Sequence, residues 1–138
     1  MSVIGTSVLS LTVAAAGAIR ANRFVGFDDA EASVAGQPVK GVAEYAATAA
    51  GQFIAATAKG TAYVISGSAV QAGDPVASDN QGRAVPAHAL SVAAGATPVT
   101  SSAANGAVLT GSVAPECIAG RALKAATASG QLIELLLT

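Results

Sequence analysis

The chain has 138 residues, of which 52% are hydrophobic, 4% aromatic and only 11% charged, and its formal net charge is −1. One domain is the natural expectation at this length, and the lack of any basic run argues against an electrostatic nucleic-acid footprint. The single cysteine, Cys117, excludes an intrachain disulfide and a multi-cysteine zinc site. About a quarter of the residues are alanine, so each core side chain buries little area, and such a core is often completed by a second subunit.

The first twenty residues, MSVIGTSVLSLTVAAAGAIR, carry no charge before Arg20. A secretion signal would begin with a positively charged stretch, which is missing here, although Ala-Ala-Ala-Gly-Ala resembles a small-residue cleavage site. Polar residues interrupt the run too often for a membrane span. The apolar Leu9, Leu11 and Val13 alternate with polar residues, as in a half-buried strand. Residues 1–20 are therefore predicted to form an N-terminal arm or first strand, which either begins the core or docks on a partner.

Glycines recur about every six to ten residues through the first part of the chain, and runs rich in Val, Ile and Phe lie between them: RFVGF, QFIAAT and TAYVIS. Short strands with regular turn signals predict a sandwich or barrel. The alanine-rich segments 43–50 and 121–129 favour helix by propensity, but both are short and each is followed by a glycine. They are interpreted as strand ends and turns, and the fold is expected to be mainly β with at most one or two short helices.

The stretch AGDPVASDNQGRAV predicts a hairpin. Gly73 and Asp74 form the turn that precedes it, and Pro75 suits the first residue of a strand, where no ladder donor is needed. Gly82 is expected to take a positive φ in the turn between the two strands. The alternative, a cation site at Asp74 and Asp79, lacks the further oxygen ligands that a calcium loop requires.

Two segments of the chain resemble one another. GVAEYAATAAGQFI, residues 41–54, aligns without gaps with GRALKAATASGQLI, residues 120–133. The match predicts two equivalent hairpins, each a strand, a small-residue turn and a strand. Alanine-rich sequences also match by chance, and the repeat is too isolated for a solenoid.

Residues 86–116 are poor in charge and rich in Ala, Ser, Thr and Gly. Within them GAVLTGSV is a possible strand and PVTSSAANG an exposed loop, so the segment is interpreted as a low-complexity loop excursion from the barrel. The C-terminal GQLIELLLT is expected to be a closing strand that is buried on both faces, because Glu134 is its only charge.

No dinucleotide-binding glycine loop, phosphate loop or nucleophile elbow occurs in the chain. His88 is the only histidine, and a nucleophilic pair with Cys117 would have no marked third group to orient it. Asp28, Asp29 and Glu31 are better explained as a solvated turn than as paired catalytic carboxylates. No catalytic, cofactor-binding or metal site is therefore predicted.

The order and spacing of the turn-and-strand motifs resemble those of the capsid cement, or head decoration, proteins of tailed bacteriophages. The resemblance covers roughly 9–85 and 117–137, and 86–116 departs from it because the family usually has a shorter connection there. The motifs are Arg23-Phe24-Val25-Gly26, Gly41-Val42-Ala43, Gly60, Ala72-Gly73-Asp74-Pro75, Gly82-Arg83, Gly120-Arg121-Ala122-Leu123 and Gly130.

This resemblance implies a single small β-barrel-like domain, residues 21–138, related in shape to lambda-type decoration proteins and preceded by an extended arm. It implies a structural virion protein, made in the host cytoplasm, that sits on the outer surface of the capsid. There it would bind the phage major capsid protein as a homotrimer at three-fold and quasi-three-fold positions, and stabilise the expanded head against the pressure of its DNA. No enzyme activity, nucleic acid or membrane is implied.

The residues expected to bind capsid or a neighbouring subunit are those of the uncharged arm. They are Val3, Ile4, Val8, Leu9, Leu11 and Val13. A β-prone terminus without Lys or Pro is an aggregation hazard unless a partner pairs with its main-chain groups. An alternative is a virion-surface adhesin-like module that binds host glycan through residues 86–115. The scarcity of aromatic residues counts against it, because sugar faces usually stack on aromatic rings.

Overall fold

The computed structural model describes residues 5–88 and 116–138. These residues form eight strands and no helix, so the alanine-rich segments are strand ends and turns, as predicted. The strands are β1 (Ser7–Ala14), β2 (Phe24–Gly26), β3 (Val39–Ala43), β4 (Phe53–Ile65), β5 (Pro75–Ser78), β6 (Ala84–Pro86), β7 (Gly120–Ala122) and β8 (Leu132–Leu137).

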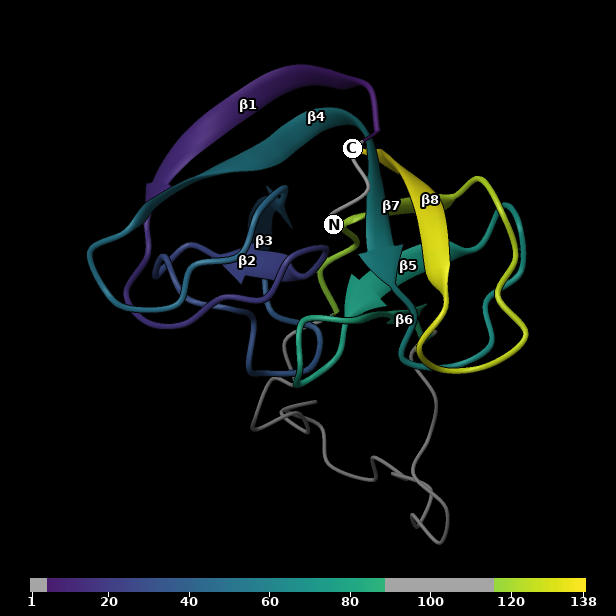
Figure 1. Ribbon diagram of the computed structural model, residues 1–138. Helices are drawn as coiled ribbons and strands as arrows, with labels where there is room; N and C mark the ends of the chain where they lie inside the picture. Colours follow the sequence, from purple (N-terminus) through teal and green to yellow (C-terminus); the bar gives the residue numbers. More distant parts are fainter. Residues whose placement is uncertain (1–4, 89–115) are drawn as a thin grey trace, which may run out of the picture.

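All ladders between these strands are antiparallel, and the sheet has the order β2-β3-β4-β8-β7-β5-β6, with β1 paired to β4 (Figure 1). The two ends of this order meet. The Phe24 N–H donates to the Gly82 carbonyl at 2.9 Å, which joins β2 to the turn between β5 and β6. A bridge between Ser66 and Ala84 joins the end of β4 to β6. The result is the predicted mainly-β, nearly closed barrel-like domain.

One expectation about the strands was wrong. QFIAAT and TAYVIS were predicted as separate strands, but both belong to β4, which continues through Gly60. Gly60 has a φ of +106°, so the strand bends there without ending. The first half of β4 pairs with β1 and β3, and the second half pairs with β8.

The predicted duplication of a hairpin is confirmed. β3 with the first half of β4 forms one copy, and β7 with β8 forms the other. In both turns a threonine N–H donates to a glutamine side chain, from Thr48 to Gln52 at 2.7 Å and from Thr127 to Gln131 at 2.8 Å. Both turns then pass through a glycine with a φ of +88°. The two sequences thus match because they build the same turn.

The duplication extends beyond the hairpins. β1, β2, β3 and the first half of β4 are matched in order by the second half of β4, β5, β7 and β8. The same main-chain hydrogen bonds recur in both halves: Gly51 N–H to Ala15 O and Gly130 N–H to Ser66 O, and Asn22 N–H to Ala43 O and Gly73 N–H to Ala122 O. Asn22 and Gly73 also share a positive φ, of 60° and 91°.

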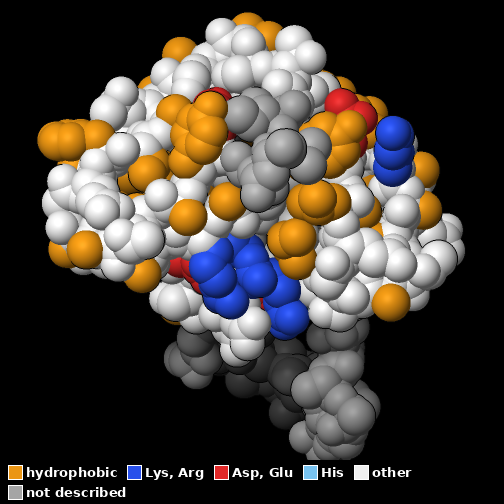
Figure 2. Space-filling model, viewed as in Figure 1, with side chains coloured by type: hydrophobic (Ala, Val, Ile, Leu, Met, Phe, Trp, Pro, Cys, Tyr) orange, Lys and Arg blue, Asp and Glu red, His pale blue; other side chains and the backbone are white. Residues whose placement is uncertain are grey.

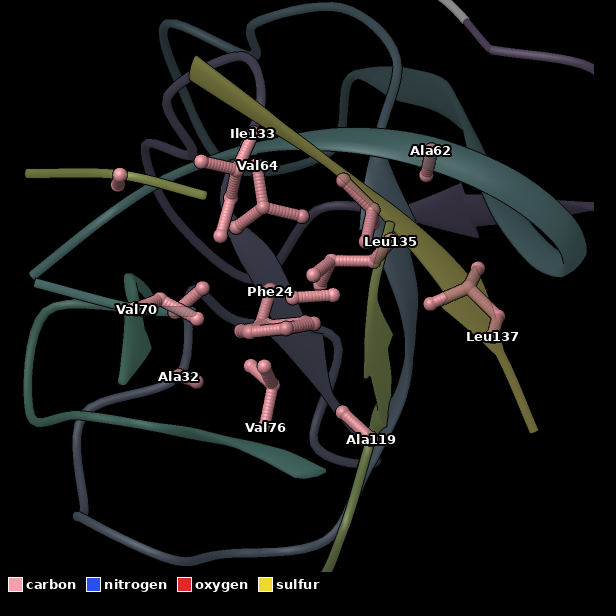
Figure 3. Packing of buried hydrophobic residues seen from close by; sticks show 14 residues of the cluster. Phe24, Ala32, Ala62, Val64, Val70, Val76, Ala119, Ile133, Leu135 and Leu137 are labelled. Carbon is pink, nitrogen blue, oxygen red and sulfur yellow. The ribbon is translucent and has the colours of Figure 1, made fainter. Parts of the chain in front are cut away.

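The core repeats as well. One buried cluster consists of Val13, Ala15, Ile19, Val25, Ala43, Ala47, Ile54 and Ala56. The equivalent positions of the second half are Val64, Ser66, Val70, Val76, Ala122, Ala126, Ile133 and Leu135, and all but the buried Ser66 belong to the other cluster. Phe24 lies in the middle of that cluster, between Leu135 and Val76 (Figure 3). Each half therefore has a small core of the same design.

The last strand differs from its prediction. Ile133, Leu135 and Leu137 of β8 are buried, but Leu132 and Leu136 are 43% and 47% exposed. Among the described residues β8 is therefore covered on one face only. Its other face carries the exposed Leu132 and Leu136 with the partly buried Glu134 between them.

The hairpin of β5 and β6 forms as predicted, with Pro75 as the first residue of β5 and Gly82 at a φ of +69°. The Asp79 carboxylate fixes the turn by accepting the N–H groups of Gln81 and Arg83 at 2.8 and 2.9 Å. Asp74 also caps its own turn, by accepting an N–H at 3.0 Å. Both carboxylates therefore serve the backbone rather than a shared cation site.

Gly82→Ala should destabilise the protein by about 1–2 kcal/mol, because an L side chain is strained at positive φ. The added Cβ would also lie 3.2 Å from the Phe24 carbonyl oxygen. Gly17→Ala is the matched control, since Gly17 has no positive φ and a Cβ there would meet nothing within 4 Å. Thermal unfolding of both variants measures the difference. Equal melting temperatures would contradict this account of the turn.

Candidate attachment surface

β1 is an edge strand within the described part of the chain, because it pairs with β4 alone. The Ala15 N–H donates to the Gln52 carbonyl, so the main-chain groups at this position face β4. Neighbouring residues of a strand turn their main-chain groups to opposite sides. Those of Thr12 and Ala14 therefore face away from β4, along an open edge.

The internal repeat shows how unusual this edge is. On the equivalent side of the second half of β4, three main-chain groups have partners from the first part of the chain. Thr61 N–H donates to Thr6 O at 2.9 Å, Ile65 N–H donates to Asn22 O at 3.1 Å, and Tyr63 O accepts the Asn22 side-chain amide at 2.9 Å. Thr6 and Asn22 thus cover one edge of the second half of β4. The equivalent edge of β1 has no such cover among the described residues.

The structure separates the six residues predicted to bind capsid. Val13 is fully buried in the chain's own core, and Leu11 is partly buried. Val8 and Leu9 remain 80% and 47% exposed. Val3 and Ile4 lie outside the described residues. Residues 7–14 are thus a strand of the barrel in this chain, and Val8 and Leu9 are the described members with free surface for a partner.

An open apolar groove of about 280 Å³ lies beside β1. Leu9 and Leu11 line one part of it, and Phe27, which is 69% exposed, lines another. Lys40 and Lys59 add positive charge to its lining. Sequence reasoning missed Phe27 because it placed this residue in a strand-like run, whereas it begins the turn after β2. Hydrophobic side chains gather on the face seen in Figure 2, next to a group of basic ones.

The residues considered for catalysis do not form a site. His88 pairs with Glu116 rather than with Cys117: its N–H donates to Glu116 Oε2 at 2.6 Å, and its Nδ1 lies 3.1 Å from Oε1. Cys117 is exposed, and its N–H donates to the Gly36 carbonyl. Among the described residues, no three His, Cys, Asp or Glu side chains gather where they could hold a metal ion.

The comparison with known families decides what kind of protein this is. A model of the phage cement protein family matches residues 3–137, which is nearly the whole chain. The chain belongs to the phage cement protein family. The resemblance found in the sequence is therefore confirmed, and it extends across the segment that departs from the expected pattern.

The fold of this cement protein is similar to that of the head fiber gp8.5 N base of bacteriophage phi29. The TM-score is 0.60 and the sequence identity 20%, over 94% of this chain and 93% of that one. This likeness concerns the fold. No curated protein matches the chain significantly in sequence.

Membership of the cement family indicates a structural role on a phage capsid, binding to that capsid, and association with the virion. It points to a protein that is not an enzyme. In the part of the chain that the structure describes, no helix is long and apolar enough to cross a membrane. Glycan binding through residues 86–115 concerns positions that lie mostly outside the described residues and stays a prediction.

The contact between His88 and Glu116 should depend on pH. The N–H and then the ring of His88 hold the pKa of the Glu116 carboxyl below its ordinary value of 4.5. A carboxyl whose pKa is lowered in the folded state stabilises the protein at pH values above its ordinary pKa. This stabilisation is lost as the pH falls through the lowered pKa. We expect the amide resonance of His88 to move in an acid titration below pH 4.5, and to stay in place in Glu116→Gln. An unchanged resonance in the wild-type chain would show that the carboxylate does not hold this amide.

Proposed function

We propose that this cement protein decorates the outside of a tailed-phage capsid as trimers at three-fold and quasi-three-fold positions, and stabilises the expanded head against the pressure of its DNA. One observation supports attachment above the others. β1 combines an open main-chain edge with exposed Val8 and Leu9, directly beside an apolar groove.

The open edge suits the addition of a strand from the capsid protein or from a neighbouring subunit. Main-chain hydrogen bonds would hold the added strand, and apolar side chains would enter the groove. Leu9, which is 47% exposed, and the partly buried Leu11 would complete their burial at the same time. Each would contribute only a part of the roughly 1.5–3 kcal/mol that full burial of an exposed side chain supplies. A free edge is also an aggregation hazard, and β1 carries no Lys or Pro to guard it, which favours a covered edge in the working state.

Trimer formation is supported by the surface and the core together. The core of each half is built largely from alanine and valine, so burial within one chain is modest. Leu132 and Leu136 leave the outer face of β8 apolar, and Leu123, just after β7, is 45% exposed beside them. A neighbouring subunit packed on this face would remove these side chains from water.

The proposed mechanism is stapling. A trimer that touches several capsid subunits adds binding free energy that rupture of the shell must overcome, and binding to the intact state alone stabilises that state. Many copies make a modest contribution per site effective. Expansion of the head would create the binding site and so determine when the protein attaches.

Attachment should depend on the exposed residues of β1. We expect Val8→Asp, and deletion of residues 2–8, to lower the affinity for undecorated expanded heads at least tenfold in co-sedimentation. The substitution places a charge in the contact, and the deletion shortens the strand edge to which the partner would bind. Val34→Asp is the matched control, since Val34 is 62% exposed but lies in the connection between β2 and β3 rather than on β1. Melting curves establish that each variant is folded. If Val8→Asp and the deletion bind as the wild-type chain does, another face of the barrel is the attachment element.

Stabilisation of the head is tested separately. DNA-filled heads saturated with the protein should release their DNA at a higher temperature than undecorated heads, because dissociation of every bound trimer adds to the cost of rupture. Release of DNA on heating is followed by a dye that fluoresces on DNA, and added Val8→Asp protein serves as the control. Equal release temperatures with full occupancy would mean that the protein decorates the shell without strengthening it.

A further inference from the structure

Three of the chain's arginines converge at one place. Arg20 lies in the connection before β2, Arg23 directly precedes β2, and Arg83 lies in the hairpin of β5 and β6. A Cβ on Gly82 would lie 3.2 Å from the Cγ of Glu31 and 3.3 Å from the Cβ of Arg23, so both side chains pack against the hairpin turn that Asp79 holds. Distant parts of the sequence thus bring three cations and two anions together in a chain whose net charge is −1.

Both carboxylates already have cationic partners. Glu31 accepts the main-chain N–H of Arg20 at 2.9 Å and forms an ion pair with the guanidinium of the same residue. Asp79 accepts two N–H groups of its own turn, and the Nε of Arg83 donates to its Oδ2 at 2.7 Å. The two anions are therefore matched to two of the three arginines.

Arg23 is left over. Its Nη1 donates to the main-chain carbonyl of Gln81 at 2.9 Å, and it forms no ion pair within the described ranges. Burial, and then repulsion by Arg20, lowers the pKa of Arg23, although arginine keeps its charge in proteins. The fold holds a partly desolvated cation here, and both nearby carboxylates form their ion pairs with the other two arginines.

The position of Arg23 is also fixed. The Phe24 N–H donates to the Gly82 carbonyl, so the hairpin turn is bound to the start of β2. A Cβ on Gly82 would lie 3.3 Å from the Cβ of Arg23, which shows how closely the turn packs against this side chain. A guanidinium held in this way loses little conformational entropy when it binds a partner.

We propose that Arg23, with Arg20 and Arg83 beside it, binds the carboxylate of an acidic side chain on the phage capsid. The guanidinium fork matches a carboxylate with two parallel N–H···O bonds, which is the geometry that favours arginine over lysine. Arginine is also enriched among the residues that dominate protein interfaces. This inference rests on the proposed attachment to capsid and adds a specific charged contact to it.

The first test removes the charge of Arg23 and keeps a donor for the Gln81 carbonyl. Arg23→Gln should raise the dissociation constant for undecorated expanded heads at least tenfold, and raising the salt concentration should weaken this variant less than the wild-type chain. Arg121→Gln is the control for loss of one guanidinium. Arg121 lies opposite Leu136 on the face proposed for the subunit contact, so sedimentation velocity first establishes that this variant keeps the oligomeric state of wild type. It should then bind heads within twofold of wild type. Arg121 also donates to a main-chain carbonyl, that of Gly73 at 3.1 Å, and also has no ion pair among the described residues. It lies on β7, outside the segments that carry Arg20, Arg23 and Arg83.

The second test identifies the partner. Arg23→Lys on decorated heads is treated with a carbodiimide, which joins an amine to a carboxylate in direct contact, and the product is analysed by mass spectrometry. We expect a cross-link from position 23 to an Asp or Glu of the major capsid protein. Arg121→Lys should give none.

The outcomes separate this inference from the proposed function. If wild type binds heads and Arg23→Gln binds equally well, the contact with Arg23 is wrong and decoration stands. If wild type does not bind heads, decoration itself fails. A cross-link to a second copy of the chain, or a changed oligomeric state of free Arg23→Gln in sedimentation velocity, overturns the capsid assignment. A cross-link within one chain overturns it too.

Discussion

The fold depends on β4 being shared by two halves of the chain. Its first half is the last strand of one repeat, and its second half is the first strand of the next. The strand must bend between them, and Gly60 provides the bend with a φ of +106°. A Cβ added at Gly60 would lie only 2.3 Å from the Thr6 carbonyl oxygen, so any other residue at this position would disturb both the bend and the start of β1. Two repeats that share a strand also leave an unmatched edge, because no strand in the described residues pairs with the outer edge of β1.

Small side chains recur at equivalent core positions of the two halves. Most equivalent core positions in the two halves hold residues of similar size, such as Ala43 and Ala122, and the largest difference is between Ala56 and Leu135. Phe24 of β2 packs in the cluster of the second half, which is therefore the larger of the two cores. The first half stays small, and it carries both the open edge of β1 and the exposed Phe53 and Phe27. The half with less internal burial is thus the one with more apolar surface available to a partner.

Local signals predicted the elements that local chemistry determines. The hairpin around Gly82, the two equivalent turns and the strand at Leu9 to Val13 each follow from residues close in sequence, and each forms. The errors arose where the answer depends on the tertiary structure. A glycine bend and a glycine turn look alike in sequence, and the apolar run of β8 gives no sign of which face lacks a cover. The meeting of three arginines and the groove beside Phe27 depend on distant segments, so no sequence pattern contained them.

An open strand edge alone would be a poor attachment site. Main-chain hydrogen bonds recur along a strand, so an added strand can slide by two residues and keep the same face buried. The apolar groove limits sliding only by shape. A charged fork at a fixed place on the barrel, off the edge, would penalise every register but one, because a shifted partner leaves both the guanidinium and its carboxylate unpaired and partly desolvated. The edge, the groove and Arg23 would then have different tasks on the shell. The first two would supply most of the contact area, and the third would select the position in which the contact forms.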